Sequence, residues 1–389
     1  MNNFIFENAT KVYFGKGCVK EYLSCFVEKY GKQVMIAYGG GSIKKNGIYN
    51  EVIAILENAG AQTVEFHGIM ANPTYEKVLE GAKLAKEHKV DWILGIGGGS
   101  VMDCCKAVSM AAVSKKDIWD NYWVKTGIID FEPLPLGVIA TVAGTGSECN
   151  GGAVITNEKV KIKTGRDYPQ CNPRFALLDP VYTYSVPVKQ MVSGGFDILS
   201  HIMETYFSEP DTDNVSDDIS EALMRSVIHN LRIAIQNPED YTARSNLLWA
   251  STMAENRIIK LGKKCDFECH QMEHQLGAYT NCNHGYGLAV LHPVYYRHIY
   301  KDGLAKFVRF AENVWQIPRE TKSEEELAKA GVEALADFIK EIGLPTTLRE
   351  LGVTKETPLK EIADSCNLAL GSYKKMTHEE IFQIFRECY

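Results

Sequence analysis

Three histidines lie close together in residues 268–285, ECHQMEHQLGAYTNCNHG, although the chain has only ten. His270 and His274 are four residues apart, so they share one face of a helix that we expect to end near Asn281. His284 would then return from a loop. Neutral imidazoles bind zinc, iron, copper and nickel, so these side chains form a candidate metal site. The alternative is that histidines with this spacing simply lie on an exposed helix face.

A second pair with the same spacing occurs in SGGFDILSHIMETY, where Asp197 and His201 again share a helix face. Together with His270 and His284 they would form a set of one carboxylate and three imidazoles, which suits Zn²⁺ or Fe²⁺. One divalent metal would thereby join segments that are far apart in sequence.

The stretch HQMEH also matches the H-x-x-E-H motif of zinc hydrolases. In that alternative Glu273 is the general base and His274 is a metal ligand. It leaves the Asp197/His201 pair and the glycine-rich turns described next without a purpose.

The stretch LGIGGGSVMDCCK places Gly97, Gly98 and Gly99 where a predicted strand gives way to a helix. Glycines there let backbone N–H groups approach an anion, and the helix N-terminus adds a partial positive charge. Ser100 and Asp103 also fit an S-x-x-D capping pair. Ser100 stands where the last glycine of G-x-G-x-x-G belongs, so the run indicates a pyrophosphate site without defining a fold.

The turn YGGGSIKK follows an earlier predicted strand, at a place where dinucleotide-binding sheets often carry an acid against the ribose 2′-hydroxyl. This turn contains no acid. Gly40, Gly41 and Ser42 offer room and donors, and Lys44 and Lys45 follow, so the turn favours a 2′-phosphate and hence NADP(H). A plain tight turn is the alternative.

The two halves of the chain differ in pattern. Residues 1–185 alternate apolar runs with amphipathic ones, which predicts an α/β dinucleotide-binding domain with a parallel sheet, helices on both faces, and ligands at the strand carboxyl ends. A further strand ends in TVAGTGSE, where Thr141 and Thr145 provide hydroxyls. Residues 186–389 show long segments of helical period, which predicts an all-helical metal-binding and substrate domain.

Composition excludes several classes of protein. The 389 residues exceed the size of a usual single core, and the net charge of −7 with acids and bases mixed gives no basic surface for nucleic acid. We find no signal peptide and no apolar run of roughly twenty residues, so we expect no membrane segment and a cytoplasmic location. Eleven cysteines without a framework spacing fit a reducing compartment.

The stretches GIGGGSVMD, AGTGSE, GGFDILSH and CHQMEHQLGAYTNCNHG together resemble the iron-containing alcohol dehydrogenase family, and look most similar to its NADPH-dependent butanol dehydrogenase and aldehyde reductase branch. The resemblance covers essentially the whole chain. It implies that Asp197, His201, His270 and His284 bind the metal, while His274 lies beside the nicotinamide.

The same resemblance implies a dehydroquinate-synthase-like fold with the active site between its two domains, and a homodimer joined by N-terminal strands. It implies hydride transfer between NADP(H) and short aliphatic aldehydes or primary alcohols such as butanal and butanol, with the proton supplied by His274 or a water relay. A lyase or synthase acting on a sugar phosphate is the alternative on this fold. The cofactor-binding residues expected from the turns and the resemblance are Gly40, Gly41, Ser42, Asn72, Gly97, Gly98, Gly99, Ser100, Asp103, Thr141, Thr145 and Lys163.

The apolar character of FDILSHIMETY indicates a small, largely neutral substrate. Trp119, Trp123 and Tyr206 could line its pocket, although aromatic residues of this kind are as often part of the core.

Overall fold

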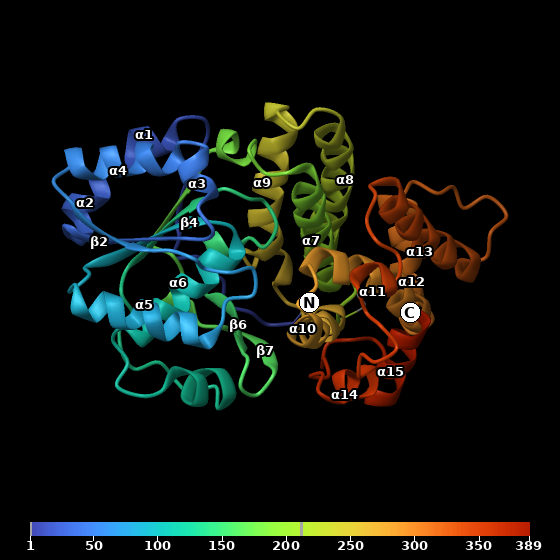
Figure 1. Ribbon diagram of the computed structural model, residues 1–389. Helices are drawn as coiled ribbons and strands as arrows, with labels where there is room; N and C mark the ends of the chain where they lie inside the picture. The colour runs from blue at the N-terminus through green and yellow to red at the C-terminus, as the bar shows by residue number, and fades with distance from the viewer. Residues whose placement is uncertain (1, 211–212) are drawn as a thin grey trace. The chain divides into compact units, whose positions relative to one another are not determined.

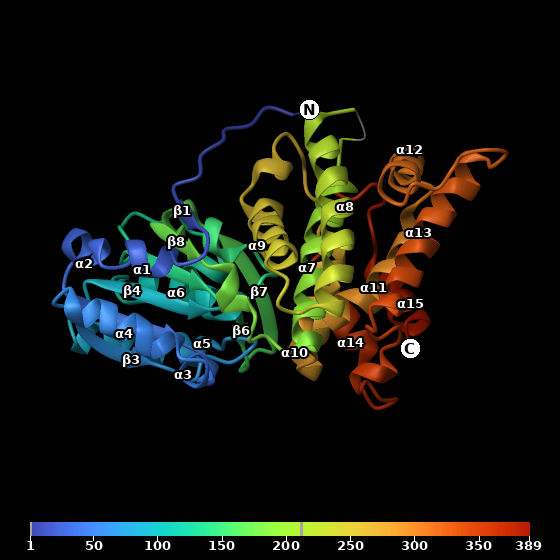
Figure 2. The ribbon, with the colours of Figure 1, turned by 90° about the horizontal axis from the view of Figure 1, so that it is seen from above.

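Six parallel strands form one sheet in the order β1-β8-β5-β4-β2-β3 (Figures 1 and 2). The computed structural model describes residues 2–210 and 213–389. The predicted parallel sheet is confirmed. Its strands are β1 (Lys11–Phe14), β2 (Gln33–Tyr38), β3 (Gln62–Phe66), β4 (Trp92–Gly97), β5 (Leu136–Ala140) and β8 (Phe175–Leu178).

Helices cover both faces of this sheet because its strands are apolar on both sides (Figure 1). Successive side chains alternate between two cores: Met35 and Ile93 belong to one, Ile36 and Leu94 to the other. The first core includes α5 (Tyr75–Glu87) and α6 (Gly99–Ala111); the second includes α1 (Cys18–Tyr22), α2 (Cys25–Tyr30), α3 (Ser42–Lys45) and α4 (Ile48–Asn58).

An antiparallel hairpin, β6 (Gly152–Asn157) and β7 (Ile162–Asp167), lies outside the main sheet and was not expected from the sequence. It is joined to α6 by the fully buried Lys106, whose Nζ donates to Gly152 O at 2.7 Å, Ser147 Oγ at 2.7 Å and Asn150 Oδ1 at 3.0 Å. These bonds compensate for burying the ammonium group.

The second unit consists of residues 2–6, 188–210, 213–238 and 257–389. In these residues the structure has helices and only isolated bridges, so the predicted helical domain is confirmed. Its α-helices are α7 (Val188–Tyr206), α8 (Val215–Gln236), α10 (Glu268–Thr280), α11 (His284–Ile299), α12 (Leu304–Arg309), α13 (Glu324–Glu341), α14 (Leu359–Asp364) and α15 (His378–Glu387). None of the helices described is both long and apolar enough to cross a membrane.

Helix α9 (Tyr241–Glu255) differs from the expected division at residues 185 and 186, because it groups with the α/β unit of residues 7–187. The Oγ of Ser251 accepts hydrogen bonds from Gly144 N at 2.9 Å and Gly146 N at 3.0 Å. Arg244 Nε also donates to Thr183 Oγ1 at 3.0 Å. A helical period in the sequence cannot reveal this grouping, because these contacts join distant segments.

Candidate metal centre and cofactor turns

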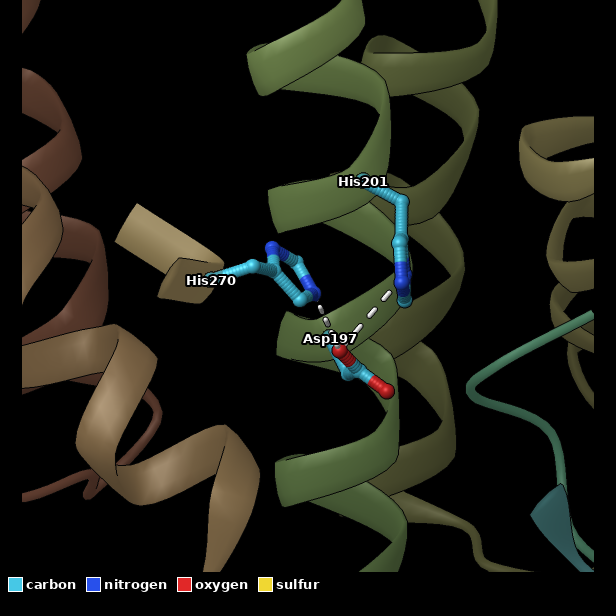
Figure 3. A group of neighbouring side chains, drawn as sticks. All are labelled: Asp197, His201 and His270. Atoms are coloured by element: carbon cyan, nitrogen blue, oxygen red, sulfur yellow. Dashed lines mark ion pairs between the residues drawn. The ribbon is translucent and has the colours of Figure 1, made fainter. Parts of the chain in front are cut away.

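Helices α7, α10 and α11 bring the four proposed ligands together. Asp197 and His201 lie one turn apart on α7, and Figure 3 shows the Asp197 carboxylate facing both His201 and His270 of α10. The Oδ1 atom of Asp197 is 3.5 Å from His201 Nδ1, 3.7 Å from His270 Nε2 and 3.5 Å from His284 Nε2. Three of the four side chains are buried, and that of His284 is 28 % exposed.

The atoms of this cluster have the chemistry of a divalent metal site. Asp197 Oδ1 and His270 Nε2 are buried without a hydrogen-bond partner, and the distances between them and their neighbours are too long for good hydrogen bonds. Buried polar atoms are normally satisfied. A cation that accepted their lone pairs would satisfy them, and ligand atoms of Asp197, His201 and His270 all lie within 4.8 Å of one another. The donor set of carboxylate and imidazoles therefore fits Zn²⁺ or Fe²⁺.

Carboxyl groups and imidazoles alternate in the cluster and shift one another's pKa values. Burial alone would raise the pKa of Asp197, but His201, His284 and His270 together hold it well below its usual range. Burial would likewise lower the pKa of His270, but Glu204 and Asp197 outweigh burial and raise it to about 10.

Two functional candidates, Glu204 and Glu273, were not recognised in the sequence as partners of the ligands. Glu204 Oε2 accepts a hydrogen bond from His270 Nδ1, and Glu273 Oε2 accepts one from His284 Nδ1. Both glutamates are fully buried. Glu204 follows His201 by three residues on α7, so its helical spacing was a usable signal.

The zinc-hydrolase interpretation is not supported by these contacts. A general base must face the reacting water, whereas the buried Glu273 carboxylate bonds to His284 Nδ1. Ligand atoms of Glu273, His274 and His284 also lie within 4.8 Å of one another. However, His284 presents Nε2 to Asp197 and Nδ1 to Glu273, so the two groups use opposite sides of its ring.

His274 is a buried neighbour of the proposed ligands. Its ring centroid is 6.0 Å from that of His270 and 5.9 Å from that of His284. Its role beside the nicotinamide, which the family resemblance implies, stays a prediction.

His284 is the first residue of α11, rather than part of a loop as expected. Helix α10 ends at Thr280 with Asn281 in the left-handed conformation, and Asn283 caps α11 by accepting from Tyr286 N at 3.1 Å. Gly285 permits a close approach to α7, because a Cβ there would lie 2.4 Å from Ser193 O. This approach brings His284 to Asp197.

The glycine turn after β4 leads into α6, which begins at Gly99 with Gly98 as its N-cap. The S-x-x-D capping interpretation is therefore wrong. Ser100 lies inside the helix and donates from Oγ to Ala71 O at 2.5 Å. Asp103 instead accepts hydrogen bonds from Ser147 Oγ at 2.6 Å and from the backbone N of Val154 in β6 at 2.9 Å. It therefore joins α6 to the hairpin.

Several residues expected to contact the pyrophosphate and the rest of the dinucleotide lie near one another in the α/β unit. A Cβ at Gly99 would lie 2.4 Å from Thr145 Oγ1, and Thr141 N donates to Gly97 O at 3.0 Å. The loop containing Asn72 adjoins the hairpin, because Thr156 N donates to the carbonyl of residue 73 at 2.9 Å.

Lys163 pairs with Thr156 across this hairpin and is buried. The structure therefore places Lys163 near the Asn72 loop, although the two are far apart in sequence.

The turn after β2 is open, but an acid lies next to it. A Cβ at Gly40 or Gly41 would meet no atom within 4 Å. Lys44 Nζ bonds to Glu65 Oε1 of the adjacent strand β3 at 2.8 Å, and this hydrogen bond raises the pKa of Lys44. The turn itself lacks an acid, as its sequence shows, but the charge of Lys44 is partly neutralised.

The three aromatic residues considered for a substrate pocket are core residues. Trp119 and Trp123 belong to a core of the α/β unit. Tyr206 is fully buried on α7 and donates to Glu221 Oε1 at 2.8 Å.

Comparison with known proteins identifies the family. Residues 9–180 match the model for iron-containing alcohol dehydrogenase, and residues 191–389 match the C-terminal model of the Fe-containing alcohol dehydrogenase family. The chain belongs to the iron-containing alcohol dehydrogenase family. This dehydrogenase is thus an oxidoreductase of alcohols and aldehydes.

Relatives of this iron-containing alcohol dehydrogenase match along nearly its whole length. NADH-dependent butanol dehydrogenase A of Clostridium acetobutylicum is 38 % identical over 393 residues, covering 100 % of both chains. NADPH-dependent aldehyde reductase YqhD of Escherichia coli is 34 % identical over 357 residues, covering 91 % of this chain and 90 % of its own. The crystal structure of NADH-dependent butanol dehydrogenase A from Thermotoga maritima superposes with a TM-score of 0.94 at 35 % identity, covering 100 % of this chain and 99 % of its own.

Proposed function

We propose that this dehydrogenase reduces short aliphatic aldehydes such as butanal to primary alcohols, by hydride transfer from NADPH and with one divalent metal, Fe²⁺ or Zn²⁺. The observation that carries the proposal is the convergence of Asp197, His201, His270 and His284, two of whose facing atoms are buried without a hydrogen-bond partner. Relatives named butanol dehydrogenase and aldehyde reductase support the substrate class.

These four residues would hold the metal, which when bound supplies Lewis-acid polarisation of the substrate carbonyl. Asp197 contributes the negative charge among the ligands, and the imidazoles contribute neutral donors. His274, buried beside His270 and His284, would hold or pass the proton that the product alcohol requires.

The charges around the cluster favour a neutral substrate over a sugar phosphate. Asp197, Glu204 and Glu273 are buried carboxyl groups within the same group of side chains. With neutral imidazoles, the three carboxylates outweigh the two positive charges of the proposed metal, so the cluster keeps a net negative charge that disfavours a phosphate, and burial strengthens this effect because screening by water is reduced. This argument weighs against the lyase or synthase alternative.

NADP(H) as the cofactor is supported by the open turn after β2. Gly40 and Gly41 leave space, and Ser42 and Lys45 offer a hydroxyl and a charge for a 2′-phosphate. Glu65 limits the contribution of Lys44, because the two form an ion pair. The relatives' names include both NADH-dependent and NADPH-dependent enzymes, so a direct comparison of the two cofactors is needed.

We also infer a homodimer and a cytoplasmic location. The N-terminal segment exposes Ile5 to 95 % and Phe14 to 42 %, and β1 is an edge strand of the sheet, features typical of a surface that pairs with another chain. Buried cysteines without disulfides, such as Cys104 and Cys149, suit a reducing compartment. Light scattering should give twice the chain mass of 43.5 kDa.

Turnover of butanal by the metal-loaded enzyme tests the proposed reaction. We expect kcat/KM with NADPH to be higher for butanal than for phosphorylated aldehydes such as glyceraldehyde 3-phosphate. Activity on the phosphorylated substrate with none on butanal would exclude the proposal.

Metal content of purified variants tests the ligand assignment separately. His270→Ala should lose both metal and activity, because one donor of the set is removed. His274→Ala should keep the metal and turn over more slowly. A metal-free His274→Ala together with a metal-loaded His284→Ala would show that the ligands are assigned wrongly.

A further inference from the structure

Glu204 holds His270 through two hydrogen bonds. Its Oε2 atom accepts from the ring Nδ1 of His270, and its Oε1 atom accepts from the backbone N of the same residue at 3.2 Å. Both residues are buried, with side-chain exposures of 0 % for Glu204 and 6 % for His270. One carboxylate on α7 therefore fixes both the position of the first turn of α10 and the rotation of the His270 ring.

These contacts determine which nitrogen of the neutral ring keeps its lone pair. A carboxylate only accepts hydrogen bonds, so His270 Nδ1 must carry the proton in this contact. In the neutral ring, the form that binds a metal, Nε2 then carries the lone pair, and Nε2 is the atom that lies 3.7 Å from Asp197 Oδ1. The opposite tautomer would place the Nδ1 lone pair against the carboxylate.

Glu273 makes the same arrangement at His284. Its Oε2 atom accepts from His284 Nδ1, and His284 Nε2 lies 3.5 Å from Asp197 Oδ1. The Glu273 side chain needs the space beside Gly287, because a Cβ at that glycine would lie 2.8 Å from Glu273 Cγ.

The Glu204 carboxylate also accepts a hydrogen bond from Ser200. Ser200 Oγ lies 3.4 Å from Glu204 Oε2 and 2.7 Å from Nε2 of the fully buried His292. With Ser200 donating to Glu204, His292 donates from Nε2 to Ser200. Ser200 and His270 then both donate to the Glu204 carboxylate, which is thereby held between His292 with Ser200 on one side and the proposed ligand His270 on the other.

We propose that Glu204 and Glu273 are positioning residues that hold the metal-facing tautomers of His270 and His284 and thereby set the affinity for the metal. Glu204 has the larger effect, because it also accepts from the backbone N of His270 and because His270 is more deeply buried than the 28 % exposed His284. A carboxylate on the far nitrogen also makes each imidazole a stronger donor. This inference rests on the ligand assignment proposed above.

The test measures the Zn²⁺ affinity of metal-free protein by competition with a chromophoric chelator. Glu204→Gln and Glu273→Gln keep the size and an acceptor oxygen but remove the charge. We expect Glu204→Gln to weaken the affinity roughly 10- to 100-fold, and Glu273→Gln to weaken it less. Replacement of Zn²⁺ by Co²⁺ should show shifted d–d absorption in Glu204→Gln, a signature that a loss of packing alone would not give.

Glu221→Gln is the matched control, because Glu221 is also a buried carboxyl group of the helical unit but bonds to Tyr206 rather than to a ligand. Its Zn²⁺ affinity should equal that of the wild type. Unchanged affinity in both Glu204→Gln and Glu273→Gln would overturn the inference. Wild-type affinity in Asp197→Ala would show instead that the proposed metal site itself is wrong.

If Glu204→Gln does not fold, Ser200→Ala gives an independent test, because it removes only the hydroxyl between Glu204 and His292. We expect this variant to bind Zn²⁺ severalfold more weakly. Wild-type affinity in Ser200→Ala, together with wild-type affinity in Glu273→Gln, would overturn the inference.

Discussion

Gly40 is the residue at which the proposed cofactor preference can be changed with little disturbance of the backbone. It lies in the turn after β2, its Cβ would meet no atom within 4 Å, and it has no positive φ that would strain a side chain. The neighbouring Lys44 is already paired with Glu65, so a new acid at Gly40 would not find an unpaired Lys44 to neutralise it.

We predict that Gly40→Asp lowers the ratio of kcat/KM with NADPH to kcat/KM with NADH by at least roughly tenfold. Like charges a few ångströms apart near a protein surface repel by on the order of kilocalories, and about 1.4 kcal/mol corresponds to tenfold. Gly40→Asn has the same shape without the charge and should leave the ratio near that of the wild type. A wild-type enzyme that prefers NADH, or a ratio that Gly40→Asp does not change, would contradict the assignment of this turn.

At the scale of elements, the buried Asp266 joins three parts of the helical unit. Its carboxylate accepts from Ser372 Oγ at 2.6 Å, from Tyr295 OH of α11 at 2.7 Å, and from Glu268 N at the start of α10 at 3.1 Å. Burial, with a smaller contribution from the charge of Glu204, raises the pKa of Asp266 to about 7. The hydrogen bonds from Ser372 and Tyr295 act in the opposite direction.

This raised pKa predicts that the contribution of Asp266 to the free energy of unfolding decreases as the pH rises from about 4 to about 7. In that range Asp266 is protonated in the folded protein but ionised in the unfolded chain. Because the folded state binds one more proton, the free energy of unfolding decreases as the pH rises. Asp266→Asn removes the ionisation and should reduce this loss by roughly 1–3 kcal/mol. Denaturant unfolding at several pH values measures the effect.

Asp337→Asn is the control for this prediction, because Asp337 is an exposed carboxylate on α13. Its stability profile between pH 4 and pH 7 should match that of the wild type. An Asp266→Asn profile that also matches the wild type would show that Asp266 does not cause the pH dependence.

At the scale of the whole molecule, the proposed ligands lie on α7, α10 and α11 of the helical unit, so a bound metal would link these three helices. Binding to the folded state alone stabilises it by about 4 kcal/mol when the free ligand is a thousandfold above Kd.

We predict that removal of the metal by a chelator accelerates amide hydrogen exchange in α7, α10 and α11. The central strands β2, β4 and β5 of the α/β unit should change little. Asp197→Ala should show no metal-dependent difference in any of these elements. Equal acceleration in the sheet and in the three helices would contradict the assignment of the metal to the helical unit.

The sequence determined the features that depend on neighbouring residues. The four-residue spacing of Asp197 and His201 fixes a shared helix face, and apolar runs ending in glycine specify buried parallel strands followed by turns. The metal-ligand hypothesis followed from residue types and spacing together with the family resemblance.

Only the tertiary structure decided which distant groups meet. It placed Glu204 behind His270, grouped α9 with the α/β unit, and set Glu65 against Lys44. It also showed that Ser100 bonds to a distant carbonyl rather than capping its helix. Helical and strand periods report which face of one element is apolar, but hydrogen bonds between elements depend on how their backbones approach in three dimensions, and local periodicity does not encode that approach.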